Sequence, residues 1–282
     1  MLLKFFKRPL PTVFSAIVII AILIWFRTFV GIDSLSFYFD EKGMPFYELL
    51  LRLAGGNRFF ENLLALTALL LTAFYLIQLN TKHILIKYRT YLPTLLYILL
   101  SSSFLPLQRV NPAVFSIFFI VLAIDKLYGS YDKSEKLDNI FMAGFYVAIA
   151  SLFYFNASLY LVLVIISLIV LKSIGVKEVL VTLFGFLTPW FFLFFYHFFF
   201  YDNLQYIPDV IFSALDTIGE NRYYGVLFTI LYSFTGLLLL IGLYYLLKVL
   251  PTQKISIRKF YVLLLWFVVL SIPIAFFTTN SS

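Results

Sequence analysis

Nine long apolar stretches divide the sequence and constrain what the chain can fold into. Each is about 15 to 25 residues long, close to the roughly 20 residues that an α-helix needs to cross a lipid hydrocarbon core. Hydrophobic residues make up 62% of the chain and charged residues only 12%, about half the charged share of a soluble domain. The sequence therefore predicts an all-α, polytopic transmembrane helix bundle that forms a single integral-membrane domain over residues 1–282.

The nine predicted spans differ in length, and one of them is short. The first span is predicted to be a retained helix and not a signal peptide, because it is longer than a signal h-region and eight more spans follow it. The third holds about sixteen residues, near the lower limit for a crossing. Either it forms a hairpin with the fourth span whose polar turn is tucked into a cavity, or Arg109 anchors an ordinary outer turn. The spans are Thr12–Val30, Phe59–Leu79, Leu92–Leu107, Pro112–Leu127, Ile140–Phe155, Ala157–Leu171, Val179–Tyr201, Tyr223–Leu247 and Phe260–Thr278.

Lysines and arginines divide unevenly between the two sides of the predicted membrane. With the N-terminus inside, fifteen of the 21 lie on the inner side, as the positive-inside rule expects. We therefore predict a multi-pass protein of the inner (cytoplasmic) membrane with its C-terminus outside. The net charge of +7 then reflects topology, and nucleic acid is excluded as a partner. The six outer cations are Arg27, Lys42, Arg52, Arg58, Arg109 and Arg222.

Several kinds of chemistry are excluded by composition. The chain has no cysteine, which rules out disulfides, thiolate metal sites and thiol catalysis. Its two histidines, His83 and His197, are assigned to opposite membrane faces, so no histidine metal site is predicted. Asp125, at the inner end of the fourth span, is predicted to pair with Lys126 or to face water. No Walker or dinucleotide-binding motif occurs in the sequence.

Two outer connections are predicted to carry amphipathic surface helices. In the first outer loop, residues 31–58, apolar side chains recur at helical spacing after Pro45, with Glu48 and Arg52 as an i,i+4 pair on the other side. The glycine pair at Gly55 predicts the end of this helix. In the second loop, residues 202–222, a polar stripe predicts a helix over Asp209–Gly219. Both helices are expected to lie at the membrane surface.

Acidic residues in the first outer loop are the sharpest candidates for chemistry. Asp33, Asp40 and Glu41 lie within about ten residues of the end of the first span, and three aromatic residues precede the Asp40–Glu41 pair. A carboxylate held at the membrane surface can accept a proton from a hydroxyl nucleophile, or hold a divalent cation that neutralises a phosphate leaving group. Lipid headgroup phosphates lie in the same zone.

The order of these N-terminal features resembles the GT-C superfamily of integral-membrane glycosyltransferases. The shared pattern is a basic N-terminus, a first helix, an outer loop with Phe39-Asp40-Glu41, a surface segment from Met44 to Leu50, a glycine pause and a long apolar helix. The resemblance implies that Asp40 or Glu41 is the catalytic base or a metal-binding carboxylate. It also implies that Arg109 or Arg222 meets the phosphate of a polyprenyl-phosphate-linked sugar. The chain also resembles a family of small bacterial polytopic membrane proteins that supplies no function.

Three functions remain open from the sequence. The first is a GT-C-like glycosyltransferase that uses a lipid-linked sugar at the outer face. The second is a non-enzymatic subunit or scaffold of a cell-envelope assembly, with an envelope protein as its partner and the GT-C fold retained without activity. The third is a transporter or flippase, which is disfavoured because the centres of the predicted spans carry almost no charge.

Overall fold

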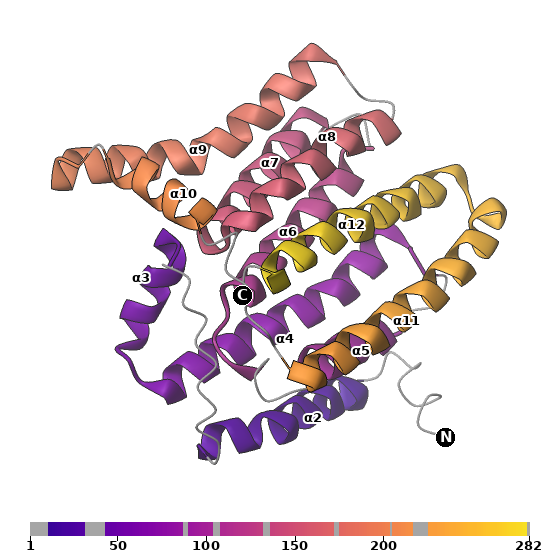
Figure 1. Cartoon of the computed structure of the whole chain (residues 1–282). Helices are drawn as coiled ribbons and strands as arrows, with labels where there is room; N and C mark the ends of the chain where they lie inside the picture. The colour runs from indigo at the N-terminus through magenta and orange to yellow at the C-terminus, as the bar shows by residue number, and fades with distance from the viewer. Residues whose placement is uncertain are drawn as a thin grey trace. The chain divides into compact units, whose positions relative to one another are not determined.

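The described part of the chain is a series of helices (Figure 1). The structure, a computed structural model, describes residues 11–31, 43–86, 90–103, 108–131, 136–171, 175–203, 205–216 and 225–280. Every regular element within these ranges is a helix, which confirms the all-α prediction. Seven helices of the described chain are long and apolar enough to cross a membrane. The protein is therefore a multi-pass helical membrane protein, as the composition indicated.

Seven of the nine predicted spans correspond to these long helices. The other two are shorter than predicted. α5 (Leu92–Ser101) has ten residues, so it rises only about 15 Å, and α8 (Tyr160–Val170) has eleven and follows a 3₁₀ segment, η2 (Phe155–Leu159). A last short 3₁₀ segment is η3 (Leu250–Thr252). The long helices are α2 (Pro11–Val30), α4 (Arg58–His83), α6 (Pro112–Gly129), α7 (Lys136–Phe153), α9 (Val176–Tyr201), α11 (Gly225–Val249) and α12 (Ile255–Asn280).

The helix predicted in the first outer loop is present as α3 (Pro45–Ala54). A proline occupies its first turn, where no backbone N–H is needed. Gly55 ends it in the left-handed conformation, with φ of 62°, and its N–H bonds to Arg52 O. The predicted Glu48–Arg52 pair also forms, with 3.7 Å between Oε2 and Nη2. Local sequence signals therefore fix both ends of α3.

The second short helix, α10 (Tyr206–Asp216), begins earlier than the predicted Asp209. Pro208 lies inside its first turn, which a proline tolerates because the first N–H groups of a helix have no partner within the helix. Residues 217–219, where the predicted helix was to end, lie outside the described residues.

The chain divides into two compact units. Unit 1 comprises Met1–Asp125 with Ile149–Tyr154, and unit 2 comprises Lys126–Ala148 with Phe155–Ser282. The expectation of one integral-membrane domain over residues 1–282 stays a prediction.

In unit 1, α2, α4 and α5 lie side by side (Figure 1). Helix α4 runs antiparallel to α2, since Phe14 contacts Phe74 and Phe29 contacts Phe59, with ring centroids 4.2 Å and 5.3 Å apart. Trp25 of α2 is fully buried in the apolar core between these helices. The two ends of the unit are called here the Arg58 end and the His83 end, after the first and last residues of α4.

In unit 2, helices α7 and α9 run parallel and touch backbone to backbone. Gly144 of α7 faces the carbonyl of Thr182, and Gly185 of α9 faces the carbonyl of Phe141. Near the start of both helices, Lys136 Nζ lies 2.6 Å from Glu178 Oε1. Small residues allow such close approach in membranes, where tight van der Waals packing drives helix association.

Replacing Gly185 by alanine is expected to destabilise the fold. The new Cβ would overlap the Phe141 carbonyl, so the two backbones must move apart, and overpacking of this kind costs about 1–3 kcal/mol. Thermal unfolding of purified protein in detergent measures the loss. Gly236→Ala on α11 is the matched control, because nothing lies within 4 Å of its added Cβ. Equal melting temperatures for both variants would contradict the close contact.

Helix α8 runs antiparallel to α12 in the same unit. The Tyr160 hydroxyl is 2.8 Å from Ser271 Oγ, and at the other end Lys259 Nζ donates to Leu171 O at 3.3 Å. Lys259 also lies over the ring of Tyr131, 4.9 Å from its centroid.

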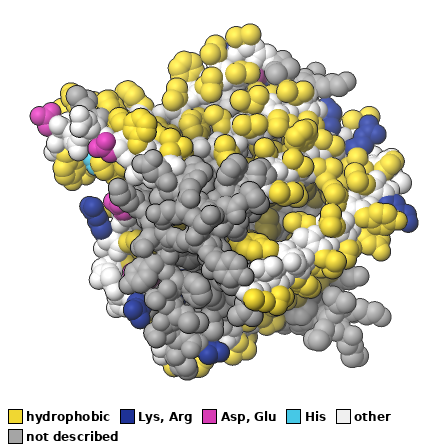
Figure 2. All heavy atoms as spheres, viewed as in Figure 1, with side chains coloured by type: hydrophobic (Ala, Val, Ile, Leu, Met, Phe, Trp, Pro, Cys, Tyr) yellow, Lys and Arg dark blue, Asp and Glu magenta, His cyan; other side chains and the backbone are white. Residues whose placement is uncertain are grey.

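Apolar side chains cover most of the described surface on the face drawn in Figure 2. Among the described residues, helix α9 exposes many large apolar side chains, including Phe191, Phe192 and Phe199, each more than 60% exposed. A surface of this composition is stable in lipid and not in water.

Candidate functional site

Only Arg109 of the five predicted site residues is among the described residues. Asp33, Asp40, Glu41 and Arg222 lie outside them. Gly43, just before α3, is the first described residue after the acidic pair. Of the predicted outer site, the structure describes α3, the turn that carries Arg109, and the helices that hold this turn.

The turn from Gln108 to Val110 is buried at the Arg58 end of unit 1. Gln108 is only 4% exposed and Val110 9%, whereas Arg109 between them is partly exposed. Gln108 donates from Nε2 to Ser102 O at 2.9 Å, and its Oε1 accepts from Thr28 Oγ1 at 2.6 Å. Both ends of the buried amide are thus satisfied. Burial favours the tucked hairpin over an ordinary exposed turn, the two alternatives left open by the sequence.

Helix α2 also fixes the start of this connection. The indole N–H of the fully buried Trp25 donates to Ser102 Oγ at 2.9 Å. Ser102 is itself 2% exposed, just beyond the end of α5. Together with Thr28, one face of α2 therefore holds both sides of the hairpin.

Helix α3 is joined to the same turn. The Tyr47 hydroxyl donates to Val110 O at 3.3 Å, and both residues are buried. Beside it, the ring of Phe46 packs edge-on against Phe153 with centroids 5.6 Å apart. The helix that follows the acidic pair in the chain is thus attached to the turn that carries Arg109.

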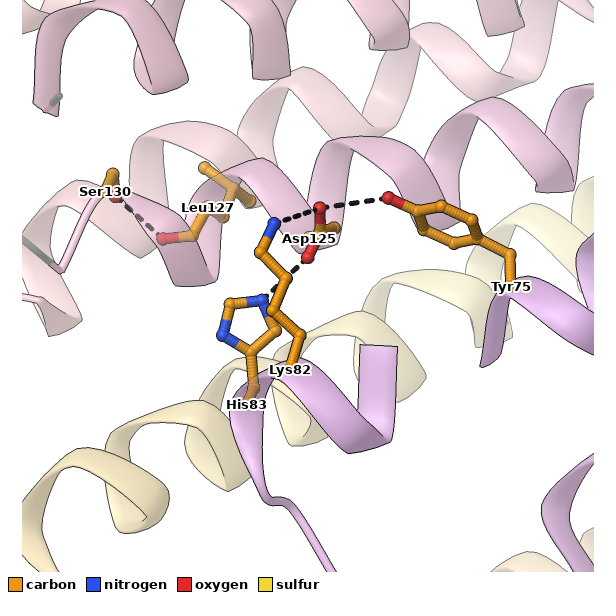
Figure 3. A network of polar contacts seen from close by, with 6 residues as sticks. All are labelled: Tyr75, Lys82, His83, Asp125, Leu127 and Ser130. Carbon is orange, nitrogen blue, oxygen red and sulfur yellow. Dashed lines mark hydrogen bonds and ion pairs between the residues drawn. The ribbon is translucent and has the colours of Figure 1, made fainter. Parts of the chain in front are cut away.

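A second polar cluster, which was not predicted from the sequence, lies at the His83 end of unit 1 (Figure 3). Asp125 of α6 is 3% exposed and accepts three hydrogen bonds from α4. Its Oδ2 accepts from Tyr75 Oη at 2.9 Å and from Lys82 Nζ at 2.8 Å, and its Oδ1 lies 2.7 Å from His83 Nε2. These four residues are called the Asp125 cluster below.

The donors of the Asp125 cluster share one face of α4. Lys82 and His83 follow Tyr75 by seven and eight residues, which is about two helical turns. The partner predicted for Asp125, Lys126 or water, is thus replaced by an interhelical network. A signal was available, because Lys82, His83 and Asp125 were all assigned to the inner side. The sequence alone does not show that α4 and α6 are neighbours.

The cluster can hold a buried negative charge. A buried carboxylate is costly unless it is paired and hydrogen-bonded, and here one ammonium, one phenol and one imidazole satisfy it. Its groups do not make a metal site: within the described part of the chain, no group of three or more histidine, aspartate or glutamate side chains could hold a metal ion.

The fold and its two polar regions define a multi-pass α-helical membrane protein. Buried polar contacts lie at both ends of unit 1. A family model described as "Family of unknown function (DUF6427)" matches residues 48–282. The match covers most of the chain, and the protein belongs to this family. The matched region includes Arg109, Arg222 and the Asp125 cluster, and it begins after Asp33, Asp40 and Glu41. Comparison with curated proteins and with solved structures finds no match.

Proposed function

We propose that this protein is a GT-C-like glycosyltransferase that uses a polyprenyl-phosphate-linked sugar at the outer face of the cytoplasmic membrane. The observation that carries the proposal is the hydrogen bond from Tyr47 to Val110 O. It joins α3, which directly follows the acidic pair, to the turn of Arg109. Carboxylates from the first outer loop and a guanidinium from the hairpin are then expected to face one site.

The proposed reaction divides the roles between these groups. Asp40 or Glu41 accepts the proton of an acceptor hydroxyl, whose oxygen forms a bond to the anomeric carbon of the sugar. The bond from that carbon to the donor phosphate breaks, and the polyprenyl phosphate leaves with the electron pair. Arg109 or Arg222 stabilises the phosphate charge through its guanidinium. A divalent cation held by the acidic pair would supply the same stabilisation.

We further propose nine membrane crossings, with the N-terminus inside and the C-terminus outside. Helices α4 and α6 run in the same direction, since Asp125 near the end of α6 contacts the last residues of α4. The chain between them must therefore return to the Arg58 end, which supports a crossing that includes the short α5. The parallel pair α7 and α9 supports a second return, through η2 and α8, in the same way.

Replacing Arg109 by alanine tests the proposed site. A charge-assisted hydrogen bond contributes about 1.5–3 kcal/mol, so we expect sugar transfer to slow about 10- to 100-fold. Polyprenyl-phosphate-linked sugars, quantified by mass spectrometry of cellular lipid extracts, should then accumulate relative to wild type. Arg52→Ala is the matched control, because the Arg52 side chain is 81% exposed on α3. Equal lipid-linked sugar pools in both variants, at equal expression, would contradict the role of Arg109.

A second function, a non-enzymatic subunit of an envelope assembly, is favoured by the exposure of α11. Only 6% of the apolar window within Thr229–Thr252 is buried, and Leu237, Leu240 and Tyr244 are all more than half exposed. A helix of a partner membrane protein would cover this surface as well as lipid does. Full complementation by a variant without the acidic pair would favour this function over catalysis.

A further inference from the structure

The Asp125 cluster contains one negative charge and two groups that compete to neutralise it. Lys82 contributes an ammonium group, and the His83 imidazole can become a second cation by taking up a proton. With His83 neutral, the carboxylate and Lys82 balance each other. With His83 protonated, the imidazolium alone can balance the carboxylate, so the Lys82 charge is no longer required.

The side chains of Asp125, His83 and Lys82 differ in their exposure to solvent. This difference bears on whether Lys82 can leave the carboxylate. The Asp125 side chain is 4% exposed and that of His83 9%, whereas that of Lys82 is 50% exposed. The Asp125–His83 pair is thus enclosed, while the Lys82 ammonium already reaches the surface of the described chain. Lysine can keep its charged head in water while its stem stays on the helix.

We infer that Asp125 and His83 form a proton-binding site within the helix bundle, and that Lys82 competes with the bound proton for Asp125. Neutral His83 donates its Nε2 hydrogen to Oδ1 of Asp125. Hydronium transfers a proton to the other ring nitrogen, Nδ1, and leaves as water, so no other covalent bond is broken. The Lys82 ammonium then exchanges its hydrogen bond to Asp125 for one to water. Within the described part of the chain, Lys82 and Tyr75, both from α4, hydrogen-bond to the carboxylate of this pair.

The inference stands apart from the proposed glycosyl transfer, because it concerns the opposite end of unit 1. It assigns a ligand, the proton, to a cluster that the proposed reaction does not use. Charges within about 4–6 Å change proton affinity by one to three powers of ten, which makes the competition measurable.

The chain has two histidines, so replacing one leaves the other as a single signal in an NMR titration. His197→Phe keeps an aromatic ring against Tyr206, on which His197 stacks at 3.6 Å, and leaves His83 as the single reporter. The protein is labelled with ¹⁵N-histidine, reconstituted in lipid nanodiscs, and titrated by NMR. In this background we expect Lys82→Gln to increase the proton affinity of His83 at least tenfold, Lys82→Arg to leave it within about twofold, and Asp125→Asn to reduce it at least tenfold.

Lys82→Gln is the deciding variant, because its half-exposed side chain is not needed to fill the core. A His83 proton affinity that is the same in wild type and in Lys82→Gln would overturn the inference, as would a His83 signal that stays in one protonation state from about pH 5 to pH 9 in both proteins. If Asp125→Asn does not fold, the contrast between Lys82→Gln and Lys82→Arg still decides the outcome.

Discussion

Replacing Asp40 by asparagine and Glu41 by glutamine together is expected to reduce sugar transfer about 10²- to 10⁴-fold, the typical loss when a positioned general base is removed. Neither substitution changes side-chain size appreciably, so expression and folding should remain normal. The variant is introduced into cells that lack the native protein, and recovery of the envelope phenotype is scored together with the pool of lipid-linked sugar. The single variants show which carboxylate acts as the base.

The control for this experiment is Glu48→Gln on α3. Glu48 is also an acidic residue of the predicted outer side, but its side chain is 40% exposed and pairs only weakly with Arg52 at 3.7 Å. Removing a solvated surface charge usually changes stability by less than about 0.5 kcal/mol, so this variant should complement fully. If the double variant at Asp40 and Glu41 is expressed normally and complements equally well, the catalytic proposal is wrong and the envelope-subunit function becomes the better one.

Replacing Asp125 by alanine is expected to lower the free energy of unfolding by about 3–5 kcal/mol, the usual loss when one partner of a buried ion pair is removed. The substitution leaves the nearly buried His83 and the Tyr75 hydroxyl without their carboxylate, and it removes the polar link between α4 and α6. Thermal unfolding in detergent, followed by size-exclusion chromatography of the heated samples, measures the effect.

Two comparisons separate this effect from a general intolerance of substitution. Glu48→Ala removes an exposed pair, which should cost about 0.3–0.5 kcal/mol or less. The triple variant Asp125→Leu, Lys82→Met, His83→Leu removes all the charges together, and apolar replacement of a whole buried ion cluster is often neutral. It should therefore regain most of the lost stability. An Asp125→Ala variant that melts like wild type would show that the cluster does not hold the two helices together.

Structural elements that depend only on residues close together in the sequence could be predicted. The apolar lengths gave the long helices, because a helix in lipid satisfies its backbone hydrogen bonds within itself. The ends of α3 were also predictable. A proline in the first turn and a left-handed glycine after the last turn act through the local backbone, so the predicted Gly55 stop and the Glu48–Arg52 pair both appear in the structure.

Contacts between distant segments were decided only by the tertiary structure. The sequence marked Gln108 and Arg109 as a polar turn, but the burial of Gln108 depends on Thr28, 80 residues away. Asp125 was assigned to Lys126 or water because nothing local links it to His83, 42 residues away. Amphipathic and apolar patterns show which faces avoid water, yet in lipid nearly every face is apolar. Which helix packs against which is therefore set by side-chain fit and by the few buried polar groups that must find partners.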